Sequence, residues 1–195
     1  MYKRQVYFNA GALLNLPSGL QFGIEQKVAP NIYWDFEGGI LLFSKTPTIV
    51  DFNAMNRKGY RIQTGGKVYL TDYFFVGPQF LFKKVTMDEQ EWLWRFDNTY
   101  EQRFDTRRTR FTYAAAAELG WHYPFENSPL SLEINYAIGI QRLDVQYDAL
   151  PEDVTFDNLT NLGSRPGSTI LPFFNYKIKL KYAIGGSGKK TQRSR

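Results

Sequence analysis

The sequence predicts an all-β fold, an eight-stranded antiparallel up-and-down transmembrane β-barrel, and three observations support this prediction. Apolar and polar residues alternate with a period of two in eight stretches. Large aromatic side chains gather on one face of these stretches, whereas charged residues and glycines share the other face. Short turns and long polar loops alternate between successive stretches. Strands with an apolar, aromatic outside and a polar inside are typical of a barrel surrounded by lipid.

The stretch Tyr60–Lys83 shows the alternation most clearly. A three-residue turn at Thr71–Tyr73 keeps its large apolar side chains on one face, whereas a two-residue turn would move Gln79 and Lys83 onto that face. The sequence therefore predicts a hairpin with the three-residue turn. Pro78 has no N–H group to donate to a neighbouring strand, so we expect a β-bulge at that position.

Three strands are predicted before this hairpin. In each of them, apolar residues at every second position oppose polar residues or glycine, as Phe22 and Ile24 oppose Gly23 and Glu25. Turn-forming residues separate the strands. Their predicted ranges are Val6–Leu14, Leu20–Val28 and Ile32–Phe43.

The hairpin itself supplies the fourth and fifth strands, and three more follow it. Val85 and Met87 continue the alternation of the fifth strand, and Leu119 and Trp121 oppose Glu118 in the sixth. The remaining predicted ranges are Tyr60–Leu70, Phe74–Met87, Arg107–Phe125, Leu130–Tyr147 and Ser168–Ile184. Residues 6–185 thus form one barrel domain, and residues 186–195, rich in glycine, serine and lysine, are expected to be a disordered basic tail.

The lengths of the connections indicate two different rims. Long polar loops are expected at Ser44–Gly59, Asp88–Thr106 and Asp148–Pro166, and the other connections are short. Aromatic residues gather near both rims, which is typical of anchoring at the two interfaces of a bilayer. The short-turn belt comprises Tyr33, Trp34, Tyr73, Phe74, Trp121, Tyr123, Phe125 and Tyr182, and the loop belt Phe43, Tyr60, Phe82, Phe111 and Tyr147.

Composition excludes several classes of protein. No stretch of 18 apolar residues is present, so the sequence predicts no transmembrane helix. The absence of cysteine excludes disulfides, thiolate metal sites and cysteine nucleophiles. The formal net charge of +5 is concentrated in the basic residues near the two termini, so a basic nucleic-acid-binding face is not predicted.

The first residues contain no signal peptide, because no apolar core follows Met1-Tyr-Lys-Arg-Gln. An exported protein needs one, so we interpret residues 1–5 as a non-native leader remnant of a truncated gene. The expected location is the bacterial outer membrane, reached with a signal peptide that this sequence does not contain.

Three segments resemble known families in pattern: GLQFGIEQKVAPNIYWDFEGGILLF, GGKVYLTDYFFVGPQF and YKIKLKYAIG. They resemble the small eight-stranded outer-membrane barrels typified by OmpX and the transmembrane domain of OmpA, and more specifically the outer-membrane β-barrel families of Bacteroidota. The resemblance covers residues 6–185. It implies a monomer in contact with outer-membrane lipids and lipopolysaccharide, and it brings no catalytic or ligand motif.

The inner face of the predicted barrel carries a set of twelve charged side chains, which must pair because the interior of such a barrel has room only for side chains. A structural network of salt bridges that plugs the interior is the first interpretation. A narrow anion-favouring pore lined by Lys177, Lys179 and Lys181 is the second. The predicted network comprises Glu25, Lys27, Asp35, Glu37, Arg61, Lys67, Lys83, Glu118, Glu133, Lys177, Lys179 and Lys181.

The sequence offers no convincing catalytic or metal site. His122 is the only histidine, and its inward direction near the short-turn rim suits a structural hydrogen bond, with Glu118 as the candidate partner, better than catalysis. The acidic loop residues match no ordered cation-binding loop and are interpreted as a solvated surface; they are Asp88, Glu89, Glu91, Glu152, Asp153 and Asp157. We therefore expect no enzyme activity and no cofactor.

Two questions stay open. A soluble calycin-like barrel that binds a ligand would carry the same alternation with its apolar face turned inward; the glycines on the charged face argue against it, because a crowded interior needs small residues. An unidentified surface or envelope protein is a conceivable partner, since Trp92 and Trp94 lie on one face of a segment that could extend the fifth strand beyond the barrel.

Overall fold

The computed structural model describes residues 4–14, 19–41, 54–96, 99–151, 153–155 and 165–184. Within these ranges the chain consists of β-strands and one four-residue helix. The elements are β1 (Arg4–Asn9), α1 (Gly11–Leu14), β2 (Gly19–Ala29), β3 (Ile32–Leu41), β4 (Ala54–Tyr69), β5 (Phe74–Arg95), β6 (Tyr100–Pro124), β7 (Leu130–Tyr147), β8 (Val154–Thr155) and β9 (Gly167–Ile184).

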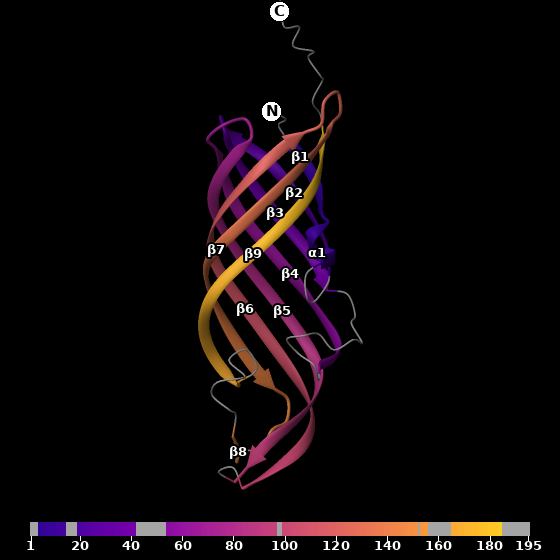
Figure 1. The fold of residues 1–195 in the computed structure, drawn as a ribbon, viewed down its shortest axis with the longest axis vertical. Helices are drawn as coiled ribbons and strands as arrows, with labels where there is room; N and C mark the ends of the chain where they lie inside the picture. Colours follow the sequence, from indigo (N-terminus) through magenta and orange to yellow (C-terminus); the bar gives the residue numbers. More distant parts are fainter. Residues whose placement is uncertain are drawn as a thin grey trace, which may run out of the picture.

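The nine described strands form one antiparallel sheet in the order β4-β3-β2-β1-β9-β7-β6-β5-β8. Because β4 also pairs with β5, the sheet closes in a ring, and β8 is added to β5 alone (Figure 1). The eight strands predicted from the sequence correspond to β1–β7 and β9. The short β8 was not predicted, because it lies within the segment interpreted as the loop Asp148–Pro166.

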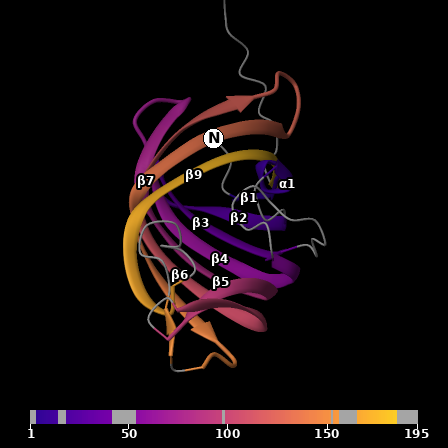
Figure 2. The same cartoon turned by 60° about the horizontal axis from the view of Figure 1, so that its bottom comes forward.

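The ring has two different ends (Figure 1). At the short-turn end, β1 begins, β9 ends, and brief turns join β2 to β3, β4 to β5 and β6 to β7. At the opposite loop end, β5 and β6 continue beyond the other strands as a two-stranded arm, to which β8 is attached. Figure 2 brings the loop end forward and shows β7 and β9 curving around one side of the ring.

The turn between β4 and β5 is the predicted three-residue turn: Tyr69 pairs with Phe75, and the Leu70 N–H donates to the Phe74 carbonyl at 2.9 Å. The bulge expected at Pro78 was wrong. The same register holds on both sides of Pro78, from Gly65 opposite Gln79 to Val68 opposite Val76. Gly77 permits this, since a Cβ there would lie 1.7 Å from the Gly66 carbonyl oxygen, so only glycine allows the two strands to approach so closely.

Three predicted boundaries were wrong. The first strand ends at Asn9, and Gly11–Leu14, predicted as strand, is the helix α1. β4 begins at Ala54, within the predicted loop Ser44–Gly59. The predicted loop Asp88–Thr106 is instead mostly strand, because β5 extends to Arg95 and β6 begins at Tyr100.

The sequence predicts a non-native leader remnant at residues 1–5 and a disordered basic tail at residues 186–195. Arg4 and Gln5, within the supposed leader remnant 1–5, belong to β1 and pair with both β2 and β9. Residues 1–3 and the basic tail 186–195 lie outside the described residues. In the described part of the chain, no helix is long and apolar enough to span a membrane.

Burial alternates along the strands of the ring. Apolar side chains on the outer face are exposed, as Trp34 (57%), Ile138 (57%) and Phe174 (70%) show, whereas charged side chains on the inner face are buried. The predicted belt residues Trp34, Tyr60, Tyr73, Trp121, Tyr123, Phe125 and Tyr182 are exposed, and Phe74, Phe82 and Phe111 are partly buried. Tyr33, also assigned to a belt, is buried inside the ring, and Tyr147 follows the inner positions of β7; Phe43 lies outside the described residues.

Candidate functional site: the charged interior of the ring

The charged side chains predicted for the interior come from six strands, β2, β3, β4, β6, β7 and β9, together with Lys83 of β5. Period-two alternation turns each of them inward. Ten of the twelve are buried; Lys27 and Lys83 are partly exposed. Lys27 lies near the short-turn end, where its ammonium nitrogen is 5.9 Å from the centre of the Tyr33 ring.

Lys67 lies at the centre of the network. Its Nζ is 2.6 Å from Glu25 Oε2, 2.6 Å from Glu133 Oε1 and 3.4 Å from Asp35 Oδ2. These carboxylates belong to β2, β7 and β3, and β7 lies across the ring from the β4 strand that carries Lys67. One lysine therefore joins β7 to β2 and β3, two strands that share no backbone hydrogen bonds with β7.

The three lysines of β9 form a ladder along the inner wall of the ring. Lys177 donates to Glu118 at 2.8 Å and to the Gln79 amide oxygen at 2.9 Å. Lys179 donates to Asp35 at 2.6 Å, and Lys181 donates to Glu25 at 2.7 Å and contacts Glu133. Each lysine that the anion-pore interpretation assigns to a pore is thus fully buried and paired with a carboxylate.

The network is balanced in charge and nearly inaccessible to water. Lys67, Lys177, Lys179 and Lys181 are 0% exposed, and the paired carboxylates are no more than 2% exposed. Buried charges are tolerated only with close partners of opposite charge, and removing one partner is strongly destabilising. In the short-turn half of the ring, the interior is therefore filled by ion pairs.

Several interior groups were not singled out by the sequence analysis. The Tyr7 hydroxyl donates to Asp35 at 2.5 Å, and the Asn135 amide donates to Glu133 at 3.1 Å and to Glu118. Tyr33, Tyr69 and Phe75 form a buried aromatic cluster next to the network. The alternation places these side chains on the inner face, so the belt prediction was wrong for Tyr33. The sequence gives no sign of which partners on other strands they meet.

The loop half of the interior has a different chemistry. Arg108 contacts Glu89 in an ion pair, and its Nη2 lies 3.1 Å from the Met87 sulfur. Between these residues and the ion network lies a cavity of about 270 Å³, and Arg61, Lys83 and Arg110 line one part of it. This division into a half with buried ion pairs and a half with a cavity is not predicted by the sequence.

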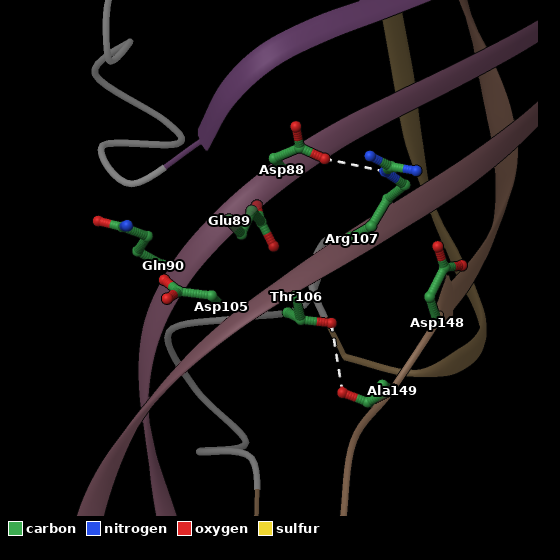
Figure 3. A pocket seen from close by; sticks show the side chains of 8 residues that line it. All are labelled: Asp88, Glu89, Gln90, Asp105, Thr106, Arg107, Asp148 and Ala149. Atoms are coloured by element: carbon green, nitrogen blue, oxygen red, sulfur yellow. Dashed lines mark hydrogen bonds and ion pairs between the residues drawn. The ribbon is translucent and has the colours of Figure 1, made fainter.

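Two acidic residues of the arm, Asp88 and Asp153, pair with arginines. Asp88 accepts from Arg107 at 2.9 Å, and Asp153 accepts from Arg95 at 2.6 Å. These hydrogen bonds lower the pKa of both carboxyls; Asn56 also donates to Asp88. Figure 3 shows Asp88 and Arg107 beside an open pocket of about 380 Å³. The described residues include no cluster of three or more potential metal ligands, while Glu152, Asp157 and the Glu91 side chain are not described.

His122 does not meet the partner that its spacing suggested. Its ring is buried and packs edge-on against Tyr69, with 6.2 Å between the ring centres, whereas Glu118 binds Lys177 and Asn135. Glu118 is nevertheless an interior residue as expected. The histidine is part of the packed interior, and its described surroundings contain no serine–histidine hydrogen bond.

No family model matches the chain, and no curated protein or solved structure shows significant similarity to it.

Proposed function

We propose that this chain is an integral outer-membrane β-barrel protein with a structural and surface-presenting role and no catalytic activity. The observation that carries the proposal is the inversion of the usual arrangement of a soluble protein: ion pairs are buried in the interior while Phe, Trp, Tyr and Ile side chains are exposed outside. A large exposed apolar surface marks contact with a lipid or protein partner. A surface that continues around a closed ring of strands fits lipid best.

The height of the apolar band supports this proposal. Outer positions carry no charged residue over eleven residues of β4 (Tyr60–Leu70), nine of β5 (Phe74–Phe82) and eleven of β7 (Leu130–Ile140). A tilted membrane-spanning strand needs about 9–11 residues. Charged outer residues appear beyond these limits, as Lys84 and Arg142 do at the loop end. The uncharged band therefore has the height of a bilayer core.

Outer aromatic contacts occur near both edges of the band. Near the loop end, Phe82 contacts Tyr60 and Tyr113 with ring centres 5.8 and 5.2 Å apart, and near the short-turn end, Phe74 contacts Trp121 at 5.4 Å. Aromatic residues are favoured at both interfaces of a membrane. We infer that outer-membrane lipids and lipopolysaccharide contact this surface and that the barrel acts as a monomer.

The soluble calycin-like alternative would require the apolar face to enclose a ligand. The buried lysines and glutamates occupy that position instead, which favours the membrane proposal. The narrow pore is disfavoured because Lys177, Lys179 and Lys181 are buried and each forms an ion pair with a carboxylate, so their charges are not free to attract a passing anion. The arm of β5, β6 and β8 is the part best placed to present residues to an envelope or surface partner.

Cell fractionation tests the proposal. The full-length gene product, with its export signal, is expressed in a Gram-negative host and its membranes are separated. We expect the protein in the outer-membrane fraction, migrating faster on gels before boiling than after it, as folded barrels do. Recovery as a folded protein in the soluble fraction would refute membrane insertion.

Planar-bilayer recording separates the plugged barrel from the pore. Purified folded protein is expected to insert without conducting, whereas steps of current with anion preference would overturn the plug and support the lysine-lined pore.

A further inference from the structure

The cavity in the loop half of the ring has one charged side and one apolar side. Arg61 of β4, Lys83 of β5 and Arg110 of β6 supply three positive charges, and Leu81, Leu143 and Phe173 line it with apolar surface. Among the described residues that line this cavity of about 270 Å³, none is an aspartate or glutamate. Its electrostatic character is therefore cationic.

Two buried hydrogen-bond donors lie in this lining. The Arg61 side chain is 9% exposed, and Nη2 donates to Gln63 at 2.6 Å, but Nε has no hydrogen-bond partner among the described residues. The Asn175 amide nitrogen Nδ2 is likewise buried without a partner in the described part of the chain. Both groups can only donate, so both need an acceptor to offset the loss of water.

The nearest carboxylate to Arg61 Nε is too far away to accept a hydrogen bond from it. Glu37 Oε1 lies 4.0 Å away, beyond hydrogen-bond distance, and the other oxygen of the same carboxylate is 3.7 Å from Lys179 Nζ. Glu37 is therefore shared with the ion-pair network. Lys83 and Arg110 make other contacts as well, and it is their charge and position that matter here.

We propose that this cavity binds a small organic anion with a compact apolar group. The oxyanion accepts hydrogen bonds from Arg61 Nε and Asn175 Nδ2, and Lys83 and Arg110 stabilise its charge. The apolar group packs against Leu81, Leu143 and Phe173. A volume of about 270 Å³ corresponds to roughly nine water molecules, which is room for an anion of the size of an aromatic monocarboxylate.

This site is independent of the membrane proposal, because it requires only the closed ring and its interior. Binding can therefore be measured on the folded protein in detergent or in any other medium that preserves the ring. A failure to bind would leave the location of the protein untouched.

Isothermal titration of the purified folded chain tests the site, with benzoate as the probe. We expect saturable binding of one benzoate per chain. Benzamide, which has the same shape without the charge, should bind at least tenfold more weakly, and inorganic phosphate, which lacks the apolar group, should also bind more weakly. No saturable benzoate binding, or equal binding of benzamide or phosphate, would overturn the proposal.

Two variants and a matched control locate the site. Arg61→Gln should weaken benzoate binding at least tenfold, whereas Arg142→Gln, which removes the same charge from the exposed outer face, should leave it unchanged. Asn175→Leu removes the second donor without altering charge and should weaken binding severalfold, so the test stands even if Arg61→Gln fails to fold. Wild-type binding by Asn175→Leu and by any folded Arg61→Gln would show that the anion binds elsewhere.

Discussion

The Lys67 ammonium nitrogen lies 2.6 Å from Glu133 Oε1, although the two residues are 66 positions apart and their strands, β4 and β7, are not neighbours in the ring. This contact crosses the interior, whereas backbone hydrogen bonds join only adjacent strands. The same glutamate also contacts Lys181 and lies 3.8 Å from Lys179. Glu133 is thus the carboxylate on which three buried lysines converge.

Replacing this carboxylate should be costly. Glu133→Gln keeps the shape but leaves three buried lysines short of negative charge, so the free energy of unfolding should fall by about 3–5 kcal/mol. Urea titration of the folded protein in detergent measures this loss. Asp144→Asn is the matched control, because its partner Arg142 has a side chain that is 60% exposed, and such surface pairs contribute about 0–1 kcal/mol. Equal effects of the two variants would contradict the structural role of the network.

The free energy of unfolding should also depend on Gly77, the residue before Pro78, where β4 and β5 approach closely. A Cβ at Gly77 would lie 1.7 Å from the Gly66 carbonyl oxygen, whereas a Cβ at Gly38 would have no heavy atom within 4 Å. Gly77→Ala should therefore force β4 and β5 apart and lower the free energy of unfolding by more than about 2 kcal/mol, a typical cost of overpacking. Gly38→Ala should change it by less than about 0.5 kcal/mol. Urea unfolding of both variants checks the difference, and a tolerant Gly77→Ala would refute the close approach.

A charged residue on the outer face should destabilise the inserted protein more, the deeper its position lies within the uncharged band. Ile138→Lys places an ammonium group inside the uncharged band of β7 and should destabilise the inserted protein by about 1–3 kcal/mol, a cost between those of the bilayer midplane and the interface. Gln146→Lys, at an exposed position of β7 beyond the band, should have little effect. Unfolding from lipid vesicles measures both. A soluble barrel would instead tolerate Ile138→Lys as an ordinary surface change.

Acid should release β8 from the arm. Arg95 donates to Asp153 at 2.6 Å and lowers the pKa of that carboxyl, while Val154 and Thr155 pair with Arg95 and Trp94. A depressed carboxyl pKa stabilises the folded contact above the pKa of the unfolded chain, and this stabilisation is lost as the pH falls through the folded value. Hydrogen exchange of β8 amides, corrected for intrinsic rates, should accelerate severalfold at acid pH. Asp153→Asn should show the faster exchange already at neutral pH, and pH-independent protection of β8 would contradict the tether.

The strands and their faces could be predicted from the sequence because an inner face of Lys, Glu and Gly opposes an outer face of large apolar residues. The arm could not be predicted, because beyond Met87 inward and outward positions alike carry polar or charged residues, as Glu89 and Gln90 show, and such a polar strand has the composition of a loop. The prediction of strand at Gly11–Leu14 was wrong because a short apolar segment fits a strand or a helix equally well. Partners such as Glu133 for Lys67 depend on how distant strands meet across the interior, which no local pattern encodes.

The most direct test of the account uses the absence of native cysteine, which lets one introduced cysteine carry a spin label. The label is placed at Ile138→Cys or Gln146→Cys in protein inserted into lipid vesicles, and collisions with oxygen and with a water-soluble nickel complex are measured. We predict that a label at position 138 meets oxygen and excludes nickel, and that a label at position 146 is accessible to nickel. Equal access of nickel to both positions would show that the outer aromatic face meets water, and would contradict the account.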